Sequence, residues 1–303
     1  MKKVLIIGNK GMLGQELVKL LLSSISGEKD YEVIGWDLNE IDITDEPKAR
    51  KKIITLAPEI IINAAAYNAV DKAEDLVEFE LAKKLNGLAP GYLATIAKDL
   101  GAVFVHYSTD YVFDGQKEKG YLENDEPSPL SNYGRSKLMG EQEVLHIGGY
   151  AELGQSHSQR GGKFYIIRLQ KLFGRPAQSS LAKKSFFETM LFLAQIKKEI
   201  EVVDEDLSNF TYAPDLAKQT EYLIKNNFPS GIYHITNEGN PTTWFGAVKI
   251  LFEMAGIKDV KLIPVSGNKF TRPAKRPKYS ILWNTKLPPL RPWPEALKEF
   301  LGK

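Results

Sequence analysis

A tyrosine and a lysine stand four residues apart in this sequence, at Tyr133 and Lys137. On a helix, residues i and i+4 share a face, so the lysine ammonium can sit beside the phenol oxygen. Free tyrosine titrates near about 10, and an adjacent positive charge favours the phenolate. The pair therefore predicts a phenol that exchanges a proton with an alcohol or ketone. Such pairs also occur by chance in helices, so the assignment depends on the surrounding motifs.

A glycine-rich segment follows the first apolar run of the chain, residues 4–7. Three glycines stand three residues apart and lead into a helix predicted over residues 12–22. Glycines at such a turn let the backbone approach a pyrophosphate, and the helix N-terminus offers free N–H groups to the phosphates. The context of strand, turn and helix predicts a dinucleotide-binding site. We assign this site to Gly8, Gly11, Met12, Leu13 and Gly14.

An acidic residue ends the second predicted strand, residues 31–36, where the adenosine ribose of a dinucleotide would lie. The carboxylate of Asp37 would accept hydrogen bonds from the ribose hydroxyls and repel a 2′-phosphate, which favours NADH. Lys10 could offset part of that repulsion, so NADPH stays open. Asp42 and Ile43 are placed to flank the adenine, although an acid near a helix start explains Asp42 equally well.

Two further segments follow strands predicted over residues 60–63 and 102–107. Ligands of open parallel sheets bind outside the carboxyl ends of the strands. The first segment carries three small alanines, which would let a nicotinamide ribose lie close to the backbone. The second carries the hydroxyls of Ser108 and Thr109, which at a strand end are often only local caps. We assign cofactor contacts here to Ala64, Ala65, Ala66 and Tyr107.

Apolar strand-like runs alternate with helical segments through the first half of the chain, including helices predicted over residues 46–56 and about 79–100. Fully apolar runs such as residues 60–62 suit strands buried on both faces. The pattern predicts an α/β fold with a doubly wound, Rossmann-like parallel sheet. The Gly/Ser-rich residues 148–162 are predicted to form a surface loop.

The alternation of strands and helices loosens after residue 169. We therefore predict a dinucleotide-binding domain over residues 1–169, to which about 205–225 could return. Residues 170–303 should form mainly a smaller, substrate-binding lobe. Arg272 and Arg276 lie in the densest basic stretch of the chain, and because guanidinium groups match phosphates, we predict that both bind a substrate diphosphate. A solvated loop is the alternative for this stretch.

Bulk composition narrows the class of protein. The chain has 303 residues, 43% of them hydrophobic, and a formal charge of +2, which gives no reason to expect a nucleic-acid partner. It contains no cysteine, and its four histidines lack helical metal-ligand spacing, so we predict no catalytic metal. No apolar run approaches the about 20 residues that span a bilayer, so we expect no membrane partner and a cytoplasmic location. A homodimer is compatible with the sequence, which does not fix the oligomeric state.

Taken together, these motifs resemble the extended short-chain dehydrogenase/reductases and, within them, the dTDP-4-dehydrorhamnose reductase family. The resemblance covers nearly the whole chain. Its specific strings are Gly-x-x-Gly-x-x-Gly at 8–14, Ser-Thr-Asp-Tyr-Val-Phe-Asp-Gly at 108–115, Ser-Asn-Tyr-Gly-Arg-Ser-Lys at 131–137 and Arg-Pro-x-x-Ser at 276–280. The resemblance implies that NADH or NADPH reduces the C4 ketone of a nucleotide-linked 6-deoxyhexulose.

The resemblance also implies residue roles. Tyr133 would protonate the ketone oxygen, Lys137 would hold the nicotinamide ribose and tune Tyr133, and Thr109 would hydrogen-bond the reacting oxygen. Asp110 would contact the sugar. Three departures lie on the substrate side: Asn68 replaces a frequent threonine, Lys171 replaces a sugar-facing tryptophan, and Asp-Leu-Ser-Asn-Phe-Thr at 206–211 replaces the usual Gln-x-Gly-x-Pro-Thr. The substrate-binding set is Asn68, Thr109, Asp110, Lys171, Arg272 and Arg276.

Two other functions share this fold. Nucleotide-sugar dehydratases and epimerases oxidise their substrate and return the hydride, but dehydratases carry Thr-Asp-Glu where this chain has Thr-Asp-Tyr at 109–111. A non-catalytic NAD(P)-binding regulatory subunit, similar to the beta subunit of methionine adenosyltransferase, would fit the substrate-side departures. The intact Tyr133, Lys137 and Thr109 favour the reductase.

Overall fold

The computed structural model of the protein describes residues 1–23, 30–149, 162–179 and 184–303. Residues 150–161, which make up most of the predicted loop 148–162, lie outside these ranges. Within the described ranges, no helix combines the length and apolar character needed to cross a membrane.

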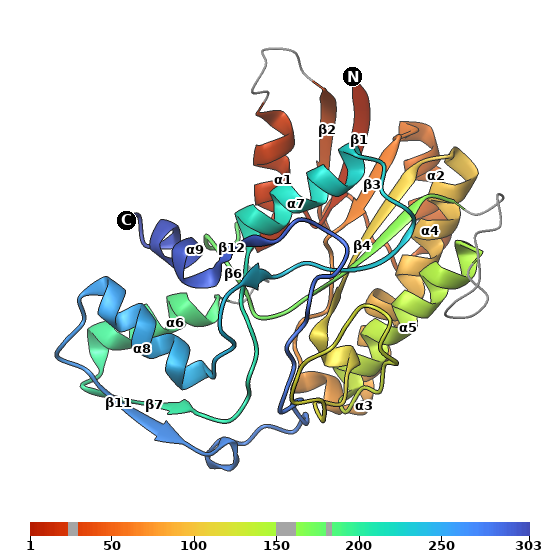
Figure 1. Cartoon of the computed structure of the whole chain (residues 1–303). Coiled ribbons are helices and arrows are strands. Elements are labelled where there is room, and N and C mark those ends of the chain that lie inside the picture. The colour runs from red at the N-terminus through yellow and green to blue at the C-terminus, as the bar shows by residue number, and fades with distance from the viewer. Residues whose placement is uncertain (24–29, 150–161, 180–183) are drawn as a thin grey trace.

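A six-stranded parallel sheet forms the centre of the molecule, in the spatial order β2-β1-β3-β4-β5-β9 (Figure 1). Its strands are β1 (Lys2–Ile7), β2 (Tyr31–Trp36), β3 (Ile60–Asn63), β4 (Val103–Thr109), β5 (Phe164–Leu169) and β9 (Gly231–His234). The chain order reverses between β1 and β3, where Ile7 pairs with Asn63. Such a switch point opens a crevice at the carboxyl ends of the strands. The doubly wound parallel sheet predicted from the sequence is confirmed.

Helices cover both faces of this sheet, as Figure 1 shows. One face packs against α1 (Met12–Leu22) and α7 (Ala213–Lys225), and the other against α2 (Glu46–Leu56), α4 (Ala89–Leu100) and α5 (Asn132–Ile147). The apolar strand residues alternate between the two cores, with Ile6 in the first and Leu5 in the second. Burial on both faces explains why these strands are apolar throughout.

The helix predicted over residues 79–100 contains a π-helical turn. The chain forms α3 (Leu76–Ala82), a π-helical turn η2 (Lys83–Leu88) and then α4. Pro90 lies in the first turn of α4, and because proline has no N–H it cannot bond the carbonyl one turn earlier. A side chain at Gly87 would also strike Met139 of α5, whose sulfur lies 2.6 Å from the position of a Cβ. The helix predicted over about 79–100 is therefore present, although it begins at Leu76 and the π-helical turn inside it was not predicted.

A smaller lobe packs beside the carboxyl ends of the strands (Figure 1). Its aromatic core, which includes Phe187 and Trp293, lies between α6 (Phe186–Ile196), α8 (Trp244–Ala255), α9 (Trp293–Phe300) and the strand pair β7 (Glu199–Val203) and β11 (Lys261–Val265). The remaining short elements are β6 (Leu172–Phe173), β8 (Thr211–Tyr212), β10 (Asn237–Glu238), β12 (Leu290–Pro292), η1 (Lys72–Glu74), η3 (Asp110–Val112) and η4 (Gly267–Lys269). β9 joins the edge of the central sheet although it follows residue 169, and the domain boundaries stay a prediction.

Candidate active site

The glycine segment forms a tight turn between β1 and α1. Gly8 has a φ of +81°, in the left-handed region that favours glycine, and a Cβ there would lie 2.7 Å from the nitrogen of Ala65. A Cβ on Gly14 would lie 2.0 Å from the oxygen of Gly8. Gly11 is the N-cap of α1 and no side chain caps the helix, so the first-turn N–H groups face the cleft without a side-chain acceptor. This turn fits a dinucleotide pyrophosphate.

The carboxylate of Asp37 lies against the glycine turn. It accepts hydrogen bonds from the backbone N–H of Lys10 at 3.2 Å and of Leu38 at 2.8 Å. These two bonds hold the acid at the end of β2, where the sequence placed the adenosine ribose. Asp42 is exposed, and its Oδ1 accepts from the N–H and the hydroxyl of Thr44 at 2.9 and 2.7 Å.

The tyrosine and lysine lie on α5, which is capped by Ser131, whose hydroxyl accepts from the N–H of Gly134 at 3.1 Å. Tyr133 is 8% exposed and Lys137 is 2% exposed. The ammonium of Lys137 donates to the backbone oxygen of Tyr107 at 2.5 Å. This bond ties α5 to the carboxyl end of β4 and holds both predicted catalytic side chains at the switch-point edge of the sheet.

The electrostatics of the pair differ from the sequence prediction. Burial raises the pKa of Tyr133, the charge of Asp110 raises it further, and a hydrogen bond with Thr109 lowers it. Burial lowers the pKa of Lys137 to about 8, although the charge of Glu141 raises it. The expected net lowering of the Tyr133 pKa was therefore wrong, because loss of water around the phenolate is the largest effect.

Thr109 and Asp110 lie at the end of β4, beside Tyr133. The hydroxyl of Thr109 donates to Oδ1 of Asp110 at 3.0 Å and accepts from the N–H of Tyr111 at 3.2 Å. Burial raises the pKa of Asp110 to about 6, while hydrogen bonds with Ser280 and Thr109 and the charge of Lys171 lower it. The local cap suggested by the sequence is present, and the same hydroxyl also interacts with Tyr133.

One cleft of about 880 Å³ joins these groups. It runs from the glycine turn along the carboxyl ends of β1, β3 and β4 to the small lobe. Most of the predicted site residues line it, namely Gly8, Gly11, Met12, Leu13, Asp37, Asp42, Ile43, Ala64, Ala65, Ala66, Asn68, Tyr107, Thr109, Asp110, Tyr133, Lys137, Lys171 and Arg276. Gly14 and Arg272 are not among the lining residues. Gly14 instead permits the close packing of the glycine turn.

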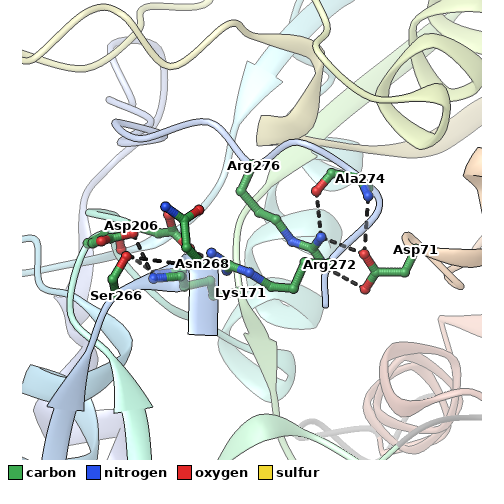
Figure 2. A network of polar contacts seen from close by, with 10 residues as sticks. Asp71, Lys171, Asp206, Ser266, Asn268, Arg272, Ala274 and Arg276 are labelled. Atoms are coloured by element: carbon green, nitrogen blue, oxygen red, sulfur yellow. Dashed lines mark hydrogen bonds and ion pairs between the residues drawn. The ribbon is translucent and has the colours of Figure 1, made fainter. Parts of the chain in front are cut away.

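The two predicted diphosphate ligands are held by carboxylates, as Figure 2 shows. Arg276 forms two bonds with Asp71, Nη1 to Oδ1 at 2.5 Å and Nη2 to Oδ2 at 2.6 Å. Arg272 pairs with Asp206, with Nη1 3.1 Å from Oδ2. Since Arg276 lines the cleft and Arg272 does not, Arg276 is the better placed of the two to meet a substrate. A contact between Arg272 and the diphosphate stays a prediction.

Several cleft residues were missed by the sequence reasoning. Tyr111, Trp244 and Asp206 line the cleft. Asp206 is 13% exposed at its side chain because Arg272 covers it. No local spacing predicted the contact of Asp71 with Arg276, since 205 positions separate them.

A glycine turn on the first strand of a parallel sheet and a buried tyrosine–lysine pair at the same sheet edge define a nicotinamide-dependent oxidoreductase of the Rossmann type. The model of the family described as RmlD substrate binding domain matches residues 1–303, and the chain belongs to this family. The family resemblance inferred from the motifs is thus confirmed.

Named relatives cover almost the whole chain. The spore coat polysaccharide biosynthesis protein SpsK of Bacillus subtilis (strain 168) is 33% identical, over 99% of this chain and 97% of the relative. A dTDP-4-dehydrorhamnose reductase of Streptomyces griseus is 34% identical, over 97% and 91%. The crystal structure of dTDP-4-dehydrorhamnose reductase from Bacillus anthracis str. Ames in complex with NADP superposes with a TM-score of 0.85, at 33% identity and with 99% and 98% coverage.

Proposed function

We propose that the protein reduces the C4 ketone of a nucleotide-linked 6-deoxyhexulose with NADH or NADPH, converting dTDP-4-dehydro-L-rhamnose to dTDP-L-rhamnose. This proposal rests on one continuous cleft. The glycine turn lines one part of the cleft, and Thr109, Tyr133 and Lys137 line another part. Relatives named dTDP-4-dehydrorhamnose reductase, at about one third identity over nearly full length, support the substrate.

The chain supplies a proton at the reacting oxygen. Bound reduced nicotinamide supplies the hydride, and Gly8, Gly11 and Asp37 are the residues that would hold its dinucleotide. Because burial and Asp110 raise the pKa of Tyr133, the phenol is protonated at neutral pH, as a proton donor must be. The Thr109 hydroxyl lies beside it and can hydrogen-bond the same substrate oxygen.

Lys137 fixes the geometry of this centre. Its ammonium is held by the carbonyl of Tyr107, and in the proposal it also binds the nicotinamide ribose. Arg276 extends the site toward the substrate diphosphate. A regulatory subunit without activity would leave the group of Thr109, Tyr133 and Lys137 without a role. A nucleotide-sugar epimerase would use the same group but return the hydride to its substrate, so only the reductase consumes reduced nicotinamide.

Three further features belong to the same proposal. Residues 1–169, together with returning segments such as α7, make up the dinucleotide-binding domain, and the remainder forms mainly the substrate lobe. The protein acts in the cytoplasm, where nucleotide sugars are made available. It assembles as a homodimer, which size-exclusion chromatography with light scattering would test.

The deciding experiment follows the loss of reduced-nicotinamide absorbance when the protein meets freshly generated dTDP-4-dehydro-L-rhamnose, with NADH and NADPH in parallel. Rapid oxidation that disappears in Tyr133→Phe supports the reductase and ranks the two cofactors. If the parent binds cofactor tightly but oxidises none of it, a different nucleotide sugar or the regulatory role takes the place of this proposal.

A further inference from the structure

Lys171 adopts an unusual backbone conformation at the sugar end of the cleft. It stands between β5 and β6 with a φ of +39°, in the left-handed region that residues other than glycine rarely adopt. Its carbonyl accepts from the N–H of Thr211 at 3.3 Å, next to the β6·β8 pair. The surrounding strands therefore fix this conformation, which directs the side chain toward the cleft.

Aromatic rings and one carbonyl hold the ammonium of Lys171. Nζ lies 4.1 Å from the ring centre of Trp244 and 5.2 Å from that of Phe210, both within the range of cation–π attraction. Nζ also donates to the backbone oxygen of Asp206 at 3.0 Å. Residues of α8 and of the segment that precedes β8 thus fix the position of the Lys171 ammonium.

Arg272 fixes the acceptor of this bond, as Figure 2 shows. Its guanidinium pairs with the Asp206 carboxylate at 3.1 Å and lies against the backbone of Gly267, where a Cβ would be only 1.8 Å from Nη2. Residues from three separate segments therefore converge on one ammonium position. This is a preorganised donor and not a solvated surface lysine.

The charges around Lys171 indicate which ligand it suits. Asp110 and Asp206 are the carboxylates that act on it, and Arg272 neutralises part of the charge of Asp206. The ammonium is therefore already balanced by negative charge, so the site does not call for an anionic sugar. An ammonium has three N–H donors, the Asp206 carbonyl takes one, and the side chain faces the cleft that also holds Tyr133.

We propose that Lys171 determines sugar specificity by donating a hydrogen bond to a ring hydroxyl oxygen of the nucleotide-linked 4-ketohexose. The inference rests on the proposed function for the class of substrate. It adds that the pocket selects hexuloses that keep this hydroxyl over deoxygenated ones, because a deoxygenated ring would leave a partly buried ammonium donor without its acceptor.

The test compares the parent with Lys171→Met, which keeps the stem and removes the charged donor. Dissociation constants are measured by calorimetry for dTDP-L-rhamnose and its 2-deoxy and 3-deoxy forms, and kcat/KM for the corresponding ketones. We expect the parent to prefer the hydroxylated sugar over one deoxy form by about 10- to 100-fold, and Lys171→Met to reduce that ratio to within a few-fold of one. Ratios that are equal in parent and variant would overturn the inference.

Lys249→Met is the matched control. Lys249 is an exposed residue of α8 whose ammonium also lies over a ring, 5.9 Å from the centre of Phe245, but it does not line the cleft. It should keep the parent's ratio, and loss of the ratio in this variant would overturn the inference. Lys171→Gln keeps a neutral hydrogen-bond donor and is expected to retain part of the parent's ratio. If Lys171→Met does not fold, Lys171→Gln takes its place in the comparison.

A pH series provides a second readout. Burial lowers the pKa of Lys171 to about 7, while the charges of Asp110 and Asp206 raise it. The ammonium is therefore lost as the pH rises through this range, and the hydroxylated sugar should bind more weakly in the parent but not in Lys171→Met.

A parent that binds with this discrimination but reduces no ketone would refute the proposed function alone, whereas reduction without discrimination would refute only the role of Lys171.

Discussion

Replacing Glu141 with glutamine should lower the stability of the fold and also lower the pKa of Lys137. Glu141 is 0% exposed and lies one turn after Lys137 on α5. Its carboxylate binds Arg168 of β5, with Nη2 to Oε2 at 2.6 Å and Nε to the two oxygens at 2.9 and 3.2 Å. Both side chains are only 1% exposed, so Glu141→Gln would leave the Arg168 charge buried without a counter-ion.

The expected loss of stability is about 3–5 kcal/mol, the usual cost of breaking one partner of a buried ion pair. For a chain of this size, a loss of that order lowers the melting temperature by on the order of 10 °C. Asp99→Asn is the matched control. It breaks the Arg50–Asp99 pair, whose side chains are 38% and 45% exposed, and should cost no more than about 1 kcal/mol because solvent screens exposed pairs.

The same variant should shift the pH dependence of catalysis. Burial lowers the pKa of Lys137 to about 8 and the charge of Glu141 raises it, so removal of that charge lowers the pKa further. The protonated lysine then disappears at lower pH, and the alkaline limb of kcat/KM moves toward neutral pH in Glu141→Gln but not in Asp99→Asn. Burial and the charge of Lys137 hold the pKa of the nearby His106 imidazole well below its usual range, so this ring is neutral and adds no charge of its own.

Urea unfolding and a pH series of kcat/KM with the nucleotide-sugar ketone measure the two effects separately. A variant as stable as the parent would refute the argument from the buried pair. A destabilised variant with an unmoved alkaline limb would show that Glu141 supports the fold without acting on Lys137.

Three other substitutions test the remaining parts of the site. Tyr133→Phe should lower kcat by about 10²–10⁴ and leave cofactor affinity nearly unchanged, and an unchanged kcat would remove Tyr133 as the proton donor. Asp37→Asn should raise the ratio of NADPH to NADH efficiency by about tenfold, since it removes the charge that repels a 2′-phosphate, and an unchanged ratio would argue against that contact. Arg276→Ala should raise the KM of the nucleotide sugar by about 10- to 100-fold with a smaller effect on kcat; an equal KM would contradict a diphosphate contact.

Local patterns in the sequence determined the sheet and predicted most of the residues that line the candidate cleft. Apolar runs and intervening helices predicted the parallel sheet, because burial on both faces leaves few polar residues in a strand. The glycine spacing after β1 and the four-residue separation of Tyr133 and Lys137 likewise follow from backbone geometry that acts over one or two turns. The π-helical turn before Pro90 was missed, because periodicity alone does not reveal a close approach such as that of Gly87 to Met139.

Only the tertiary structure decided the substrate side and the electrostatics. The bonds of Asp71 with Arg276 and of Lys171 with Asp206 join residues 205 and 35 positions apart, and no local spacing encodes such contacts. The sign of the Tyr133 pKa shift also depended on the fold, because burial and the charge of Asp110 both raise the pKa and together outweigh the hydrogen bond with Thr109. The sequence alone thus determined which groups are present and which of them share a helix or a strand end, while packing determined how much water reaches them and which distant charges they meet.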